Sequence, residues 1–173
     1  MILRYAEPSE ALAVATVHVR SWQSAYAGLL PEDYLNGLKP QERAERYTFH
    51  NRGPERGETM VAVGDDDEIC GFATYGPTPD SQSDGRSGQL YALYVDPDHW
   101  RHGVGRLLIT DVHERLTAFG FDEALLWVLV GNTRAENFYR SMGWKSDGIR
   151  RNDEVWGTPV EELRYRRTLK PAG

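Results

Sequence analysis

One stretch of the sequence constrains the fold most, residues 90–119, which read LYALYVDPDHWRHGVGRLLITDVHERLTAF. Leu90–Val95 is rich in Tyr, Leu and Val and predicts a strand, which Asp96-Pro97 ends because proline has no N–H to give to a sheet. Apolar residues then recur at helical spacing after a glycine-bearing loop, at Val104, Leu108, Val112, Leu116 and Phe119. The predicted order is therefore strand, glycine loop, helix.

This order suits a bound phosphate group. The first N–H groups of a helix have no acceptor within it and carry the positive end of the helix dipole, and glycine keeps side chains away from that backbone. Two glycines also ease an ordinary turn, and Gly103 and Gly105 alone favour that interpretation. A P-loop is excluded because the chain has no Gly-Lys pair, and Leu108 stands where a dinucleotide fingerprint has its third glycine.

A second strand and helix follow. Glu123–Val130 is a nearly continuous apolar run, as in a strand buried on both faces. Asn132 suits a helix N-cap, and Gly143 suits the position that ends the helix. Four residues between them share one helical face, namely Ala135, Phe138, Tyr139 and Met142.

Together the two segments resemble the GCN5-related N-acetyltransferase superfamily. That family pairs a loop Q/R-x-x-G-x-G/A with a downstream segment N-x-x-A-x-x-F-Y-x-x-x-G-F/W. The corresponding segments here are WRHGVG, Trp100–Gly105, and NTRAENFYRSMGW, Asn132–Trp144. The second segment matches at every position. The first departs at Trp100, where the family has Gln or Arg. This difference affects one side-chain contact with the ligand and leaves the backbone donors of the loop unchanged.

The resemblance implies a fold and an activity. The fold is α/β, with a mostly antiparallel sheet of six to seven strands, a splayed parallel pair and helices on both faces, in a single domain over residues 1–173. The activity is transfer of an acetyl group from acetyl-CoA to a primary amine by direct attack in a ternary complex. Two alternatives stay open: a non-catalytic acyl-CoA-binding or sensor module on the same fold, and a transferase of another acyl group.

The resemblance also implies site residues. The pyrophosphate-binding loop comprises Arg101, His102, Gly103, Val104, Gly105 and Arg106. The splayed strand offers the backbone of Leu93, Tyr94 and Val95 to the pantetheine amides and the thioester oxygen. Asn132, Ala135 and Phe138 of the second motif complete the cofactor-binding set. His102 replaces a residue that is usually basic, and an exposed loop histidine is an equal alternative.

The proton donor that the resemblance implies is Tyr139, next to the departing sulfur, with core packing as the alternative role. No general base is evident, because Gln89 and Tyr91 stand in the central strand where the resemblance suggests a carboxylate. A base that acts through water, or capture of the neutral amine, therefore stays open.

Shorter patterns predict the other elements. The expected strands are Ile2–Ala6, a hairpin of Thr59–Val63 and Ile69–Tyr75, and a charged, solvated ribbon of Trp144–Arg150 and Val160–Arg167. The expected helices begin at Pro8, with Leu12, Ala15, Val19 and Trp22 on the apolar face, and span Gln41–His50. The polar segment Pro77–Gly88 predicts a surface loop.

Three aromatic residues lie in the segment Trp22–Leu38, which Gly28 and Pro31 divide into two helical parts. The resemblance implies that this segment overhangs the substrate side of the acetyl-CoA cleft. Trp22, Tyr26 and Tyr34 then either form a wall of the acceptor pocket or pack in the core, and packing is the favoured interpretation.

Several classes of function are disfavoured. A net charge of −6 argues against a broad nucleic-acid surface and is compatible with a cationic amine. Cys70, the only cysteine, allows no internal disulfide and is expected to be a buried, inert thiol. We expect no metal site, because His99 and His102 lack a third ligand candidate at suitable spacing and Asp65–Asp67 suits a solvated turn.

No stretch has membrane-spanning length and no signal-peptide pattern is present, so a cytoplasmic location is the default. The expected partners are acetyl-CoA and a small-molecule or peptide amine, without nucleic acid or membrane. The sequence leaves a homodimer open and does not identify the acceptor.

Overall fold

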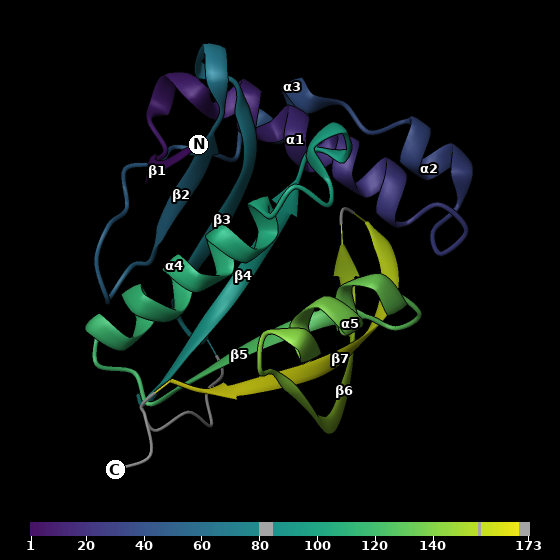
Figure 1. The fold of residues 1–173 in the computed structure, drawn as a ribbon. Helices are drawn as coiled ribbons and strands as arrows, with labels where there is room; N and C mark the ends of the chain where they lie inside the picture. Colours follow the sequence, from purple (N-terminus) through teal and green to yellow (C-terminus); the bar gives the residue numbers. More distant parts are fainter. Residues whose placement is uncertain (80–84, 156, 170–173) are drawn as a thin grey trace.

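The computed structural model describes residues 1–79, 85–155 and 157–169. In this part of the chain seven strands form one sheet in the order β1-β2-β3-β4-β5-β7-β6 (Figure 1). The strands are β1 Ile2–Tyr5, β2 Glu58–Val63, β3 Ile69–Pro77, β4 Ser87–Val95, β5 Glu123–Leu129, β6 Lys145–Val155 and β7 Thr158–Thr168. Neighbours are antiparallel except β4 and β5, which run parallel. The predicted fold class is confirmed.

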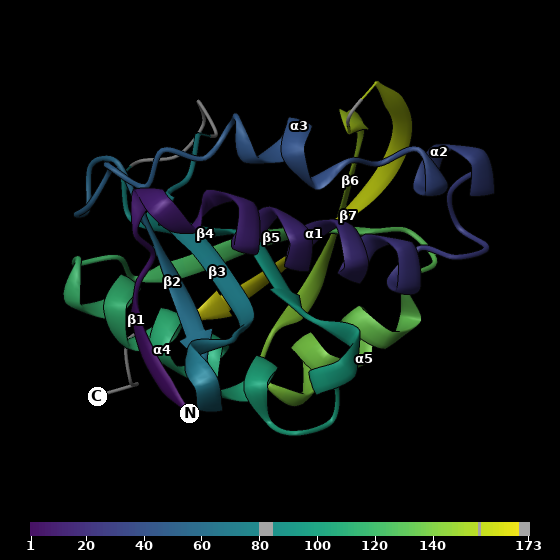
Figure 2. The same ribbon diagram turned by 90° about the horizontal axis from the view of Figure 1, so that it is seen from above.

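Helices cover both faces of the sheet, with α1 and α3 on one side and α4 and α5 on the other (Figure 2). They are α1 Ala11–Ala25, α2 Glu32–Asn36, α3 Pro40–Ala44, α4 Val104–Ala118 and α5 Thr133–Ser141. Short 3-10 turns are η1 Pro8–Glu10, η2 Asp65–Asp67 and η3 Pro97–His99. Within the described ranges, no helix combines the length and the apolar character that crossing a membrane requires.

Apolar faces hold the helices to the sheet. On α4, the predicted residues Val104, Leu108, Val112 and Leu116 are all buried. They belong to a core that also contains Trp144 and Tyr165. On the other face α1 packs through Val14 and Val17 against β2 and β3. Leu12 of α1, expected on the apolar face, is 50% exposed.

The parallel pair β4–β5 is joined only at its start. Register pairs run from Ser87 with Glu123 to Gln89 with Leu125, and the described residues show none beyond them. Just after this point the pairing of β4 with β3 shifts around Tyr91, which marks a β-bulge. A bulge bends its strand, so β4 turns away from β5. The predicted splay is confirmed.

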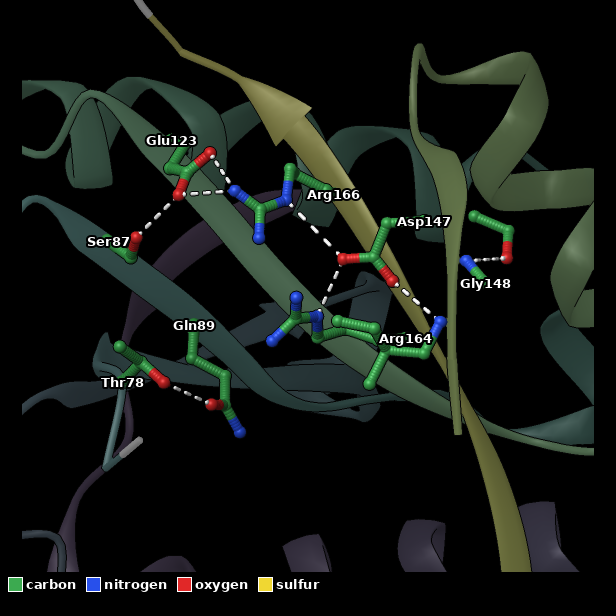
Figure 3. Close-up of polar contacts among 10 residues, drawn as sticks. Thr78, Ser87, Gln89, Glu123, Asp147, Gly148, Arg164 and Arg166 are labelled. Carbon is green, nitrogen blue, oxygen red and sulfur yellow. Dashed lines mark hydrogen bonds and ion pairs between the residues drawn. The ribbon is translucent and has the colours of Figure 1, made fainter. Parts of the chain in front are cut away.

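Charged groups hold the closed end of this pair (Figure 3). Ser87 Oγ donates to Glu123 Oε1 at 2.7 Å, and Arg166 Nη1 donates to Glu123 Oε2 at 2.7 Å. Asp147 of β6 accepts from Arg164 Nε of β7 at 2.7 Å. These bonds connect β4, β5, β7 and β6 below the splay, so the opening lies at one end of a firmly joined sheet.

Two expected segments differ. The helix predicted over Gln41–His50 ends at Ala44, because Tyr47 turns inward to share a 2.6 Å hydrogen bond with His18 Nδ1, and Phe49 adopts φ 55° while stacking on Tyr47. The loop predicted over Pro77–Gly88 is shorter, since Pro77 ends β3 and pairs with Gly88, the second residue of β4. Residues 80–84 of that prediction lie outside the described residues.

Candidate active site

A cavity of about 400 Å³ opens where β4 and β5 diverge. Its walls come from β4, β5, the loop before α4, α5 and the end of α1. All but one of the predicted site residues line it, namely Leu93, Tyr94, Val95, Arg101, Gly103, Val104, Gly105, Arg106, Asn132, Ala135, Phe138 and Tyr139. The exception, His102, is exposed and does not line the cavity, so its position fits the exposed-loop alternative.

The start of α4 contributes backbone donors to this cavity. Gly103 is the N-cap in a left-handed conformation, φ 82°, which glycine adopts without strain. The first helical bond runs from Leu107 N–H to the Gly103 carbonyl at 3.0 Å. The N–H groups of Val104, Gly105 and Arg106 therefore precede the helical ladder, where they suit an anion.

Gly105 has a packing role that the sequence did not indicate. A Cβ at this position would lie 3.3 Å from Phe138 Cζ, so glycine allows α5 to approach the start of α4. Asn132 caps α5 as predicted, because its Oδ1 accepts from Ala135 N–H at 3.3 Å. Gly143 follows the helix with φ 89°, also as predicted. The two motifs therefore meet in one packed unit.

Trp100, where the loop departs from the family pattern, lines the cavity and contacts two of its neighbours. Its Nε1 donates to the Val95 carbonyl at 2.8 Å, and the Arg134 guanidinium lies 3.4 Å from its ring centroid. Burial lowers the pKa of Arg134, and the charge of Arg101 lowers it further. Two cations that repel each other favour an anionic ligand between them. The sequence gives no sign of this role for Arg134, although the residue lies inside the second motif.

Tyr139 lines the cavity and also packs against the core, so its position is compatible with both predicted roles and tests neither. Its ring lies edge-on to Trp144, with 6.1 Å between the centroids. Burial raises the pKa of Tyr139, and Tyr94 adds to the effect. The hydroxyl therefore keeps its proton at neutral pH, as a proton donor requires.

A second cavity of about 310 Å³ adjoins the first on the α1 side of the sheet. Tyr26, Tyr94 and Trp127 line both cavities, so the two adjoin beside the opening between β4 and β5. Trp22 also lines the second cavity, as the acceptor-wall interpretation expects. Tyr34 does not line it and packs beside Leu35, so the packing interpretation applies there.

The charged ribbon of β6 and β7 is less solvated than the sequence suggests. Arg150 and Glu161 form an exposed pair at 2.9 Å, as expected. Arg164, in contrast, is only 9% exposed, and Glu162 faces the second cavity. The alternation along β7 indicates two faces of the ribbon, but the local sequence does not show that one of them is covered.

One further cluster concerns the expected absence of a metal site. The sequence indicates no third ligand candidate near His99, whereas Glu68 and Cys70 lie beside it, with ligand atoms within 4.8 Å of one another. Cys70 is buried, and burial raises the pKa of its thiol. Three such groups also meet by ordinary packing at a strand end, and we assign them no function.

Comparison with known proteins places these observations in context. The profile of the Acetyltransferase (GNAT) family matches residues 19–144. The uncharacterized N-acetyltransferase YuaI of Bacillus subtilis is 34% identical over 132 residues, which cover 75% of this chain and 72% of the relative. The [Ribosomal protein bS18]-alanine N-acetyltransferase of Salmonella typhimurium is 31% identical over 109 residues, or 63% of this chain and 68% of that protein.

Solved structures share the fold. The PaiA N-acetyltransferase from Thermoplasma acidophilum, in complex with coenzyme A, superposes with a TM-score of 0.73 at 18% identity and covers 96% of this chain and 98% of its own. The Ribosomal-protein-alanine N-acetyltransferase from Brucella melitensis gives 0.73 at 19% identity, covering 97% and 99%.

Proposed function

Since the chain belongs to the Acetyltransferase (GNAT) family, we propose that its splayed β4–β5 cavity binds acetyl-CoA and that Tyr139 serves the transfer of the acetyl group to a primary amine. Membership makes the chain an N-acetyltransferase, and the residue roles are the proposed part. One observation carries them: a single cavity brings together the open edge of β4, the free backbone donors of α4 and the Tyr139 hydroxyl.

The residues present fit acetyl-CoA at both ends of the cavity. The N–H groups of Val104, Gly105 and Arg106 suit the pyrophosphate, and Arg101 and Arg134 add positive charge at the mouth. Beyond Gln89, β4 has no partner on its β5 side among the described residues. Its edge at Leu93–Val95 is therefore open to amides that add on as a further strand would.

Acetyl-CoA, when bound, supplies the acetyl group as a thioester whose carbonyl oxygen becomes negative during attack. A backbone N–H from the open edge of β4 stabilises that charge. Tyr139 holds its proton at neutral pH and donates it to the departing sulfur. The second cavity, with Trp22 and Tyr26 in its wall, receives the acceptor amine.

Two alternatives are tested by one assay. Coenzyme A release is measured with acetyl-, propionyl- and succinyl-CoA against α-amino acids, an alanyl peptide, spermidine and phenethylamine. The proposal predicts release that depends on both acetyl-CoA and an amine. A protein that binds acetyl-CoA without amine-dependent release is a sensor module, and a preference for succinyl-CoA indicates another acyl transferase.

The wider setting belongs to the same proposal. We infer one domain over residues 1–173, a cytoplasmic location and an acceptor that is a small molecule or a peptide rather than nucleic acid or membrane. The net charge of −6 supports the acceptor class. A homodimer is compatible with this proposal, and sedimentation measures the oligomeric state.

A further inference from the structure

Glu162 lines the second cavity, whereas Glu161, its neighbour in the sequence, does not. It lies in β7 opposite Leu129 of β5 and Arg151 of β6. Its side chain is 13% exposed and lines the second cavity, whereas the side chain of Glu161 is 46% exposed and lies outside it. Successive residues of a strand face opposite sides, so only one of these two acids faces the acceptor cavity.

The surroundings of Glu162 favour both a cation and a proton acceptor. Burial raises the pKa of its carboxyl, whereas the Arg151 guanidinium, whose Nε donates to Oε1 at 3.0 Å, acts in the opposite direction. Asp153 lies close enough to raise that pKa further. Two carboxylates beside one guanidinium leave negative charge in this wall of the cavity.

Two tyrosines that line both cavities lie near Glu162 and the thioester side. Burial raises the pKa of Tyr26 most, followed by Tyr94, and the charges of Tyr139 and Glu162 also contribute. Hydrogen bonding with Tyr26 in turn lowers the pKa of Tyr94, although burial raises it overall. Tyr26 and Tyr94 line both cavities. An amine held by Glu162 therefore faces the opening that contains Tyr139.

Other charged or titratable groups also face this cavity. They are His18 from α1, Tyr26 after α1, Arg43 and Arg46 from α3 and the turn after it, Tyr91 and Tyr94 from β4, and Arg151, Asp153 and Glu154 from β6. The two arginines come from α3 and the turn after it, whereas the acids come from β6 and β7, and the acids are the groups that suit an ammonium ion.

We propose that Glu162 binds the ammonium form of the acceptor amine in the second cavity and takes its proton before attack. This inference rests on the proposed function. The ammonium N–H bond breaks and its proton passes to the carboxylate. The neutral amine then forms the C–N bond as the C–S bond breaks. The sulfur gains a proton from the Tyr139 hydroxyl, and the second proton of the nitrogen returns to the Tyr139 oxygen through water. The proton on Glu162 returns to water.

Most alkyl amines are protonated at neutral pH, because their pKa lies near ~10. An enzyme whose carboxylate accepts the ammonium form has a kcat/KM that stays level between the pKa of that carboxyl and the pKa of the amine. An enzyme without the base must wait for the scarce neutral amine, and its kcat/KM then rises about tenfold per pH unit. The shape of the pH profile therefore separates proton transfer from a purely structural ion pair between Glu162 and Arg151.

The experiment compares wild type, Glu162→Gln and Glu161→Gln with the most active amine among spermidine, phenethylamine, L-phenylalanine and an alanyl peptide. Glu161→Gln is the matched control, since it removes a cross-strand ion pair with Arg150 on the exposed face. We expect Glu162→Gln to keep its thermal shift with acetyl-CoA and to lose about 10²-fold or more in kcat/KM near neutral pH. This deficit should shrink toward pH ~10.

Each other outcome has a defined meaning. A Glu162→Gln enzyme as active as wild type, or a deficit that stays constant across the pH range, overturns the role of Glu162 and leaves the proposed function intact. A loss of the acetyl-CoA thermal shift in Glu162→Gln shows a structural role and also overturns the inference. Absence of turnover by wild type with every amine contradicts the proposed function itself.

Discussion

Gln89 faces Leu125 in the last register pair between β4 and β5, and beyond this pair the two parallel strands separate. The bulge around Tyr91 bends β4 immediately afterwards. Ser87 and Glu123 hold the pair together just below. The site thus begins where the pairing of β4 with β5 stops. Backbone N–H and C=O groups of β4 that a neighbouring strand would otherwise pair with become available to a ligand.

The glycine at the start of α4 gives the first prediction. Gly103→Glu should abolish the rise in melting temperature that acetyl-CoA causes, because it strains a left-handed position and puts a negative charge beside the phosphate donors. Gly120→Glu is a matched control with φ 94° and open space around its Cβ. An undiminished thermal shift in Gly103→Glu would place the phosphate elsewhere.

Removal of one hydroxyl tests the proton donor. Tyr139→Phe keeps the ring and its packing, so acetyl-CoA should still bind, while kcat should fall by about 10²-fold, the low end for general acid catalysis. Tyr165→Phe removes a hydroxyl of the same core that does not line the cavity, and serves as the control. Wild-type turnover in Tyr139→Phe, with chemistry limiting the rate, would return Tyr139 to a packing role.

The cap of α5 predicts a loss of stability. Asn132→Ala removes the acceptor for Ala135 N–H and should lower the free energy of unfolding by about 1 kcal/mol. Asn137→Ala, at an exposed position within the same helix, should cost little, because alanine favours helix. Urea denaturation measures both. A decrease in acetyl-CoA affinity for Asn132→Ala alone would add a ligand contact to the cap.

His113 predicts how stability depends on pH. Its Nε2 accepts from Trp144 Nε1 at 3.0 Å, and burial lowers its pKa from 6.5 to about 4, with a contribution from the charge of Arg167. The unfolded chain therefore binds a proton first, and stability falls as the pH drops from 6.5 toward 4. Since the ring is partly solvated, we expect a loss of about 2 kcal/mol rather than the full shift.

This pH dependence is measured by urea denaturation at several pH values. His113→Gln retains an acceptor for Trp144 without the titration, so its stability should change less over the same range. His102→Gln controls for the loss of a surface histidine. Equal pH dependence in His113→Gln and wild type would show that other groups are responsible.

The sequence predicted those parts of the fold and site in which the local pattern of residues already indicates where they lie in the folded chain. The α4 face, the Asn132 cap and the Gly143 terminus each follow from spacing or backbone conformation alone. The helix over Gln41–His50 was wrong because Tyr47 finds a buried partner in His18, a contact that no local pattern contains. Tertiary contacts of this kind override helix propensity.

In the candidate site, too, residues within the local motifs were predicted, and residues whose role depends on tertiary contacts were not. The cofactor side lies in two contiguous motifs, and its residues were predicted together. Glu162, by contrast, becomes part of a cavity only when β7 pairs with β5 and β6 and α1 covers that face. Arg134 was missed because its role depends on stacking with Trp100, a residue in the other motif.

Amide hydrogen exchange with and without acetyl-CoA tests the central claim most directly, that the ligand lies along the open edge of β4 and on the start of α4. We predict slower exchange in peptides that contain Leu93–Val95 and Arg101–Arg106, with unchanged exchange in β1 and β2, which lie far from the cavity lining. Slowing confined to other segments, or none in these two while acetyl-CoA still raises the melting temperature, would contradict the account.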